Sequence, residues 1–123
     1  MKIKNYRGFD CFLEYIKDPD FHGAIVSDDP NHFRGSQGLF EQAVKFFNEA
    51  SVGTKSYKMP LKIQFPSGAT IRFLSVDNTC GMVLNAALVL HTNKISYEDV
   101  LQVKTRIRQP CSNDGSLWFL ESY

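Results

Sequence analysis

The chain has 123 residues, of which 43% are hydrophobic and 22% charged, and its formal net charge is +1. This length suits one hydrophobic core and not two, so we expect a single domain over residues 1–123. The near-neutral charge gives no electrostatic footprint for nucleic acid or for an acidic membrane surface.

No segment of the sequence predicts a membrane or an exported protein. The first ten residues lack an apolar run of signal-peptide length, and the longest apolar stretch, Ala86–Leu90, is too short to span a bilayer. The cysteines Cys11, Cys80 and Cys111 are widely spaced and form no CxxC pair, which favours reduced thiols over disulfides or a zinc site. We therefore expect a protein of the cytoplasm of the cell that makes it.

Apolar spacing predicts the first elements of the chain. Phe9, Phe12, Leu13 and Ile16 recur at helical spacing and predict a short amphipathic helix that ends before Pro19. The run from Gly23 to Ser27 is apolar without alternation, as in a parallel strand covered on both faces.

The next segment predicts a second helix and a polar linker. Ser36 is a plausible N-cap for a helix with an apolar stripe from Leu39 to Phe47. Phe46 falls beside this stripe; core packing is favoured over a contact role. Residues 51–57 are polar and predict a link to the following strands.

The stretch LKIQFPSGATIRFL, residues 61–74, predicts a β-hairpin. Apolar and polar residues alternate on both sides of the turn Pro66–Ala69, in which Gly68 can adopt a positive φ. The alternation places Ile63, Phe65, Ile71 and Phe73 in the core and Lys62, Gln64, Thr70 and Arg72 outside it.

The last third of the chain predicts strand, helix and strand. Ala86–Leu90 is the best candidate for a central strand, Ser96 with Asp99 can cap a helix that stops near Pro110, and Leu117–Leu120 is the final strand. The order of elements predicts an α/β protein with three layers, a mostly parallel sheet and an inserted hairpin.

Several of these segments, in this order, resemble the ATPase domain of bacteriophage terminase large subunits, the motors that package DNA. FHGAIVSDDPNHFRGSQGLFEQAVKFF resembles the family's second strand and following helix, LKIQFPSGATIRF its inserted hairpin, and AALVL the strand that carries the Walker B carboxylates. ISYEDVLQVKTRIRQ resembles the next helix with its Ser-Arg-x-Arg-like end. SLWFLES resembles the strand that leads to the coupling motif, with Ser122 at the hydroxyl position.

The resemblance also shows which chemistry is absent. A P-loop needs glycines, a lysine for the β- and γ-phosphates and a Ser or Thr for Mg²⁺. Phe9 and Asp10 stand at the lysine and Ser/Thr positions, and His91 and Thr92 at the positions of the Walker B carboxylates. The resemblance therefore implies a P-loop-ATPase-like remnant lacking the P-loop, which is not an enzyme and binds no cofactor.

The residues offer two other chemistries, a metal site and a catalytic trio. The three histidines and three cysteines lack the close pairs typical of zinc ligands, so no metal site is expected. Ser27, Asp28 and His32 could be imagined as a catalytic trio, but the sequence has no nucleophile-elbow motif, and such trios arise by chance.

The sequence-based hypothesis is a catalytically inactive, phage-encoded protein that binds another protein in the host cytoplasm. The partner would be a host defence component, which makes the chain an anti-defence inhibitor or decoy, or the phage packaging machinery. The alternative is a DNA-packaging accessory or nucleic-acid-binding module, which the net charge disfavours.

The resemblance places the hypothetical contact surface at one edge of the sheet. In an intact ATPase the strand 117–120 has the P-loop strand beside it, so here its edge would be open to a partner chain or to a second copy in a homodimer. The residues expected at this surface are Leu117, Trp118, Phe119, Leu120, Arg106 and Arg108. The stub Met1–Asn5 is the other candidate to cover the edge.

Overall fold

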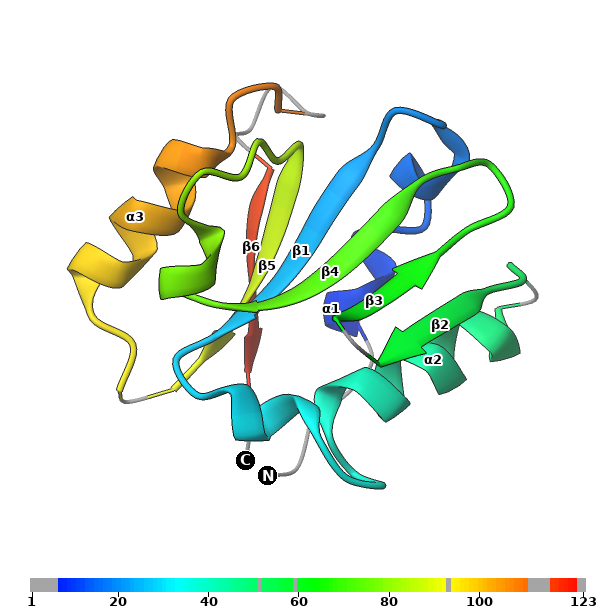
Figure 1. The fold of residues 1–123 in the computed structure, drawn as a ribbon, viewed down its shortest axis with the longest axis horizontal. Helices are drawn as coiled ribbons and strands as arrows, with labels where there is room; N and C mark the ends of the chain where they lie inside the picture. The colour runs from blue at the N-terminus through cyan, green and yellow to red at the C-terminus, as the bar shows by residue number, and fades with distance from the viewer. Residues whose placement is uncertain (1–6, 51, 59, 93, 111–115, 122–123) are drawn as a thin grey trace.

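The structure is a computed structural model in which helices lie on both faces of one six-stranded sheet (Figure 1). It describes residues 7–50, 52–58, 60–92, 94–110 and 116–121. The expectations for Met1–Asn5, Cys111 and Ser122 lie outside these residues. Within them, no helix is long and apolar enough to cross a membrane.

The strands appear in the sheet in the order β2-β3-β4-β1-β5-β6. Strands β4, β1, β5 and β6 run parallel to one another, whereas β2 and β3 are antiparallel to their neighbours. The bounds are β1 His22–Ser27, β2 Lys55–Lys58, β3 Leu61–Gln64, β4 Thr70–Ser75, β5 Ala86–His91 and β6 Leu117–Glu121. The predicted α/β class with a mostly parallel sheet and an inserted hairpin is confirmed.

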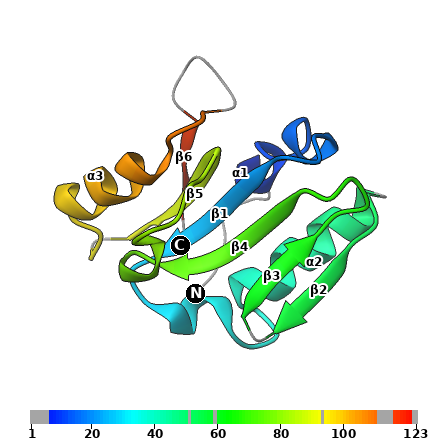
Figure 2. The ribbon, with the colours of Figure 1, turned by 45° about the horizontal axis from the view of Figure 1, so that its top comes forward.

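Helices cover the two faces unequally (Figures 1 and 2). The helical elements are α1 Arg7–Asp10, the 3₁₀ turns η1 Tyr15–Lys17, η2 Pro30–Phe33 and η3 Asp77–Thr79, and the helices α2 Leu39–Glu49 and α3 Tyr97–Arg106. One face packs against α1, η1, η2 and α2 through a large aromatic core, and the other packs against α3 and η3 through a smaller aliphatic core. The sheet is therefore the middle of three layers.

The hairpin follows its alternation closely. Ile63 pairs with Ile71 across β3 and β4, and all four predicted core residues of the hairpin are buried. The amide of Phe65 donates to the carbonyl of Ala69 at 2.9 Å, and Gly68 adopts φ +104°, which closes the turn. Thr70 departs from the expectation: it is only 8% exposed and its hydroxyl lies 3.0 Å from Nδ1 of His22.

Three local predictions were wrong or incomplete. The helix expected over residues 9–16 is split into α1, a turn and η1, although its apolar residues do face the core. The N-cap of α2 is Gly38 and not Ser36. The segment expected as a polar link contains the edge strand β2, whose sequence KSYK has no buried residue and so gives no apolar alternation.

Other local predictions were confirmed. Ser96 and Asp99 form a reciprocal capping box at the start of α3. Phe46 packs in the large core, with ring centroids 5.8 Å from Phe9 and 5.1 Å from Phe47.

Candidate functional site

The carboxyl ends of parallel strands are the usual place for a site in an open α/β sheet. Here the end of β1 and the residue after β5 carry a compact polar cluster. Ser27 Oγ lies 2.6 Å from His32 Nδ1, and Asp28 Oδ1 accepts a hydrogen bond from Thr92 Oγ1 at 3.0 Å. The cluster thus links the ends of two neighbouring strands.

The local sequence explains how this cluster forms. Asp29 caps η2 by accepting from the Asn31 amide at 2.9 Å, and Pro30 occupies the first turn. This short 3₁₀ turn brings His32 back over the end of β1. The Asp29 amide also donates to Ser27 Oγ at 3.2 Å, so the serine hydroxyl is held from two sides.

The trio Ser27, Asp28 and His32 is brought together but lacks the geometry of a catalytic triad. In a triad the carboxylate and the hydroxyl bind opposite nitrogens of the imidazole. Here Asp28 Oδ1 approaches Nδ1 at 3.9 Å, the nitrogen that already contacts the serine. Ser27 is also completely buried, so its hydroxyl cannot reach a substrate. The cluster is a structural link between β1 and β5.

The positions that the resemblance assigned to nucleotide chemistry have other neighbours. Phe9 is fully buried and packs in the aromatic core, whereas Asp10 is exposed at the end of α1. Thr92, at a Walker B position, bonds to Asp28. Among the described residues no group of three or more His, Cys, Asp or Glu side chains could hold a metal ion.

The cysteines of the described part are free thiols, as expected for Cys11 and Cys80. Burial, with a smaller contribution from the negative charge of Asp10, raises the pKa of the Cys11 thiol. Because the thiolate is the reactive form, Cys11 is a poor nucleophile near neutral pH.

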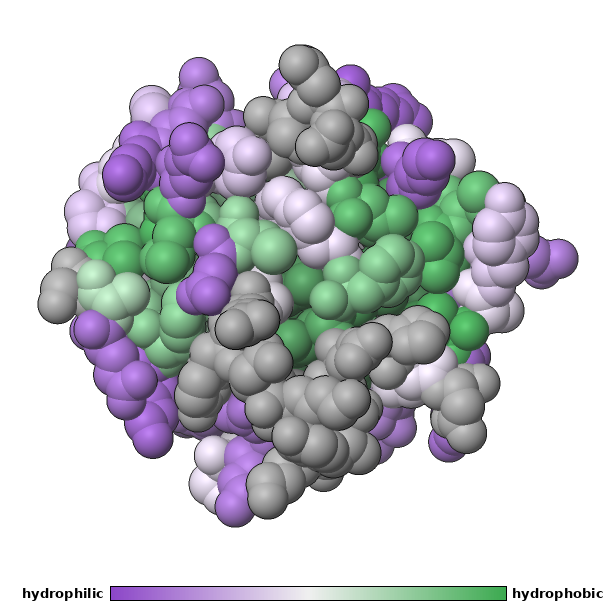
Figure 3. Space-filling view, turned by 180° about the vertical axis from the view of Figure 1, so that it is seen from behind, coloured by the Kyte–Doolittle hydropathy of each residue, from purple (hydrophilic) through white to green (hydrophobic). Residues whose placement is uncertain are grey.

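Among the strands of the described residues, β6 is the last at its end of the sheet. Its side chains alternate between the two cores: Trp118 and Leu120 contribute to the aromatic core, and Leu117 to the aliphatic one. Phe119 is 47% exposed. Figure 3 shows hydrophobic side chains gathered across the middle of the face opposite to the view of Figure 1, with hydrophilic residues around them.

Trp118 is held in an aromatic cluster and is not a free anchor. Its ring stacks on Tyr15 with centroids 5.9 Å apart and meets Phe12 edge-on at 5.6 Å. Phe12 in turn contacts Phe21 at 6.1 Å. The indole therefore packs β6 against the aromatic core, and the Trp118 side chain remains half-exposed.

The predicted arginines lie near the amino ends of the parallel strands. The Arg106 carbonyl accepts from the Leu84 amide at 2.8 Å, and the next residue, Ile107, bridges to Leu84. Arg106 is half-buried and its Nε has no hydrogen-bond partner, whereas Arg108 is exposed. These backbone contacts hold Arg106 beside the amino end of β5.

Comparison with solved structures now identifies the fold. The chain superposes on the large terminase of a thermophilic bacteriophage with a TM-score of 0.66 and 16% identity, over 94% of this chain and 29% of that one. It superposes on the ATPase domain of the large terminase of a Thermus phage with a TM-score of 0.63 and 13% identity, over 97% and 55% of the two chains. The chain has a fold like that of a terminase ATPase domain.

This terminase-like fold was expected from the resemblance and is confirmed at the level of fold. The thermophilic phage terminase in complex with ADP matches with a TM-score of 0.58 and 18% identity, over 83% of this chain. The chain spans between 25% and 56% of the length of the terminase structures that it matches. No family profile and no curated protein sequence matches it.

Sequence reasoning missed two features of this terminase-like chain. The bond between Thr92 and Asp28 joins residues 64 positions apart and leaves no local pattern. The exposed strand β2 was missed because a solvated edge strand lacks the alternation that reveals a half-buried one, although Lys62 and Arg72 beside it were expected outside the core.

Proposed function

We propose that this chain is a catalytically inactive terminase-like protein that acts by binding another protein. The polar cluster at the carboxyl ends of β1 and β5 carries this proposal. Ser27 Oγ contacts His32 Nδ1, and Asp28 Oδ1 accepts a hydrogen bond from Thr92 Oγ1, so these side chains bond within the cluster. Phosphoryl transfer needs carboxylates free to hold Mg²⁺ and donors free to neutralise phosphate.

The β6 edge is the proposed contact surface. In the described part of the chain, its four apolar residues, 117–120, form the last strand on the parallel side of the sheet, and the Phe119 side chain is 47% exposed. An added strand would gain main-chain hydrogen bonds, and the exposed ring would supply apolar contact. The packing of Trp118 against Tyr15 and Phe12 keeps the edge rigid before binding, which lowers the entropic cost.

The partner class follows from the terminase-like fold and the missing chemistry. A protein that keeps the shape of a packaging motor without its catalysis can occupy a receptor for that motor. We therefore propose a host defence component as the partner and an inhibitor or decoy as the role. Binding to the phage packaging machinery is the second form of the same proposal.

The competing candidate is a nucleic-acid-binding packaging accessory. A net charge of +1 gives little attraction to a polyanion, because sequence-independent binding depends on several Lys or Arg contacts to phosphate. This candidate would show binding that falls steeply with salt, whereas strand addition at an apolar edge would be nearly independent of salt.

The test is affinity capture from phage-infected cells with two matched variants. Phe119→Lys alters the β6 edge, and Leu101→Lys alters an apolar residue of similar exposure, 40% against 47%, on helix α3. A stoichiometric partner that is retained by Leu101→Lys and lost by Phe119→Lys supports the proposal. A partner kept equally by both variants, or recovery of nucleic acid alone, would overturn it.

A further inference from the structure

The opposite end of the sheet presents an uncovered basic face. Helix α3 and its aliphatic core cover β1, β5 and β6, but the side chains of β2 and β3 on the same face reach solvent. In Figure 2 no helix lies in front of β2, β3 and β4, and α2 lies behind them. The open face carries Lys55, Tyr57, Lys62, Gln64 and Arg72.

Three of these side chains form one row across the strands. Tyr57 pairs with Lys62 across β2 and β3, and Lys62 pairs with Arg72 across β3 and β4. The Lys62 amino group lies 5.0 Å from the centroid of the Tyr57 ring, a cation–π distance. Like charges placed directly opposite on neighbouring strands destabilise a sheet, so the fold keeps Lys62 beside Arg72 at a cost.

The row has no counter-charge within the described residues. No described carboxylate lies within 4.0 Å of the Lys62 amino group or the Arg72 guanidinium. Lys55, on the next row of the same face, is likewise unpaired within the described part of the chain and pairs by register with the neutral Gln64. The face is therefore a local excess of positive charge on a nearly neutral protein.

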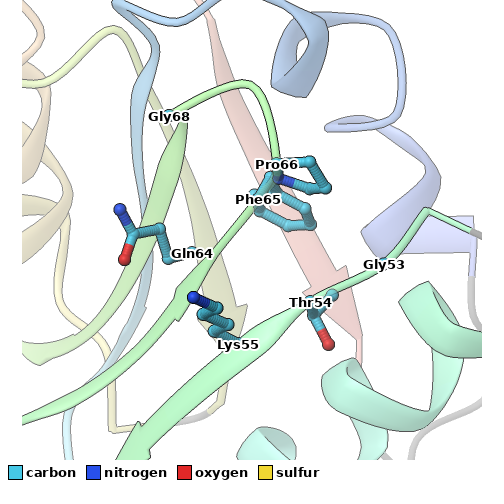
Figure 4. Close-up of a pocket in the computed structure, with 7 residues that line it drawn as sticks. All are labelled: Gly53, Thr54, Lys55, Gln64, Phe65, Pro66 and Gly68. Atoms are coloured by element: carbon cyan, nitrogen blue, oxygen red, sulfur yellow. The ribbon is translucent and has the colours of Figure 1, made fainter.

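Two structural features beside this face suit an extended peptide. Strand β2 is the last strand at its end of the sheet, and all four of its residues are exposed. A hollow of about 380 Å³ opens where Lys55 and Gln64 meet the Phe65–Gly68 turn. Figure 4 shows Lys55 and Gln64 on neighbouring strands, with Phe65 and Pro66 beyond the end of β3.

We propose that the β2 edge and this basic face bind an extended acidic segment of a partner protein. The segment would pair with the outer edge of β2 through main-chain hydrogen bonds and direct alternate carboxylates toward Lys55 and the Lys62–Arg72 row. Lysines on β2 would repel a second copy of the same edge while attracting an acidic strand. The surface lies at the opposite end of the sheet from β6, so this proposal does not rest on the proposed function.

The geometry favours a protein segment over nucleic acid. A strand edge offers N–H and C=O groups in the spacing of another polypeptide strand, which a phosphate backbone cannot match. Three cations on one short face also fall below the six to ten phosphate contacts, roughly, that give strong salt-dependent binding.

The test uses a short synthetic peptide in which glutamate alternates with valine, followed by fluorescence anisotropy at low and high salt. A single-stranded DNA oligonucleotide of equal charge is the competing probe. The variants are Arg72→Glu and Lys62→Glu on the basic face and Lys45→Glu, an exposed lysine on α2, as the matched control. Thermal melting checks that each variant folds, and Arg72→Glu should not lower the melting temperature because it removes a like-charge pair.

The proposal expects the peptide to bind the parent chain and both basic-face variants to weaken it by about tenfold or more. Lys45→Glu should bind as the parent does, and amides of residues 55–58 should gain protection from hydrogen exchange when peptide is bound. Absence of peptide binding, equal binding by all variants, or preferred binding of the oligonucleotide without protection of β2 would each overturn the proposal.

Discussion

The two edges of the sheet differ in nearly every physical property. Strand β6 is the last described strand on the parallel side of the sheet, and its side chains alternate between the two hydrophobic cores. Strand β2 closes the antiparallel side, and its four residues are all exposed and half of them are lysines. The side chains of β6 belong to the hydrophobic cores, whereas those of β2 are exposed to solvent.

This difference separates the two binding proposals. An apolar edge such as β6 would bind a partner by burial and main-chain pairing, with an affinity nearly independent of salt. A basic edge such as β2 would select a partner by charge and would resist pairing with itself. The polar cluster that joins β1 to β5 lies between the two edges.

The largest predicted effect is the difference in unfolding free energy lost when a buried residue of the hairpin and an exposed residue of β2 are truncated. Phe65 is buried, with its ring centroid 5.0 Å from that of Phe47. Phe65→Ala should cost about 3–5 kcal/mol of unfolding free energy, because it removes a core ring and leaves a cavity. Tyr57→Ala on β2 should cost less than about 1 kcal/mol. Chemical denaturation of both variants measures the contrast, and equal losses would mean that the β2 edge belongs to the core.

The second effect tests the cluster that joins β1 to β5. Ser27→Ala removes the hydroxyl that contacts His32 Nδ1 and the Asp29 amide, and both of these groups are only partly buried. The expected loss for the two hydrogen bonds is about 1–2 kcal/mol in unfolding free energy. The matched control is Ser36→Ala, at an exposed serine that caps no helix, and it should be neutral. A Ser27→Ala variant as stable as the parent would remove the structural role assigned to the cluster.

The parts of the fold that were predictable from sequence are those whose residues are buried in a regular pattern. The hairpin alternates around Pro66 and Gly68, and the run 86–90 is apolar because both of its faces are covered. The strand 55–58 could not be predicted, because a solvated edge needs no apolar residue.

The candidate site was harder to predict than the fold. The apolar edge 117–120 was visible because its residues are hydrophobic, and its place at the end of the sheet came from the resemblance to terminases. The bond between Asp28 and Thr92 depends on the pairing of β1 with β5, which are far apart in sequence, so it leaves no local pattern. The row from Tyr57 to Arg72 depends on strand β2, which has no apolar alternation to reveal it.

A third prediction links α3 to the β6 side alone. Ser96 and Asp99 cap the helix reciprocally, so Ser96→Ala should cost about 1 kcal/mol. Because α3 packs on the aliphatic core beneath β5 and β6, hydrogen exchange should rise more at β6 than at β2. Equal increases at both edges would mean that α3 supports the whole sheet.

The smallest predicted effect is a gain in unfolding free energy when one charge is removed from the basic face. Arg72→Gln relieves the repulsion between Arg72 and Lys62 and should stabilise the chain by about 0.2–1 kcal/mol. The gain should shrink at high salt, because screening already weakens the repulsion in the parent. Thermal melts at two salt concentrations measure it, and a salt-independent loss of stability would show that the arginine stem packs as core.

The central claim is that this terminase-like fold works without nucleotide, and calorimetric titration with ATP and Mg²⁺ tests it most directly. Phe9 and Thr92 stand where the resemblance places the P-loop lysine and a Walker B carboxylate; Phe9 is buried in the aromatic core, and Thr92 donates a hydrogen bond to Asp28. The account predicts no heat of binding and no release of phosphate on prolonged incubation. A saturable isotherm with a micromolar dissociation constant, or steady hydrolysis, would contradict it.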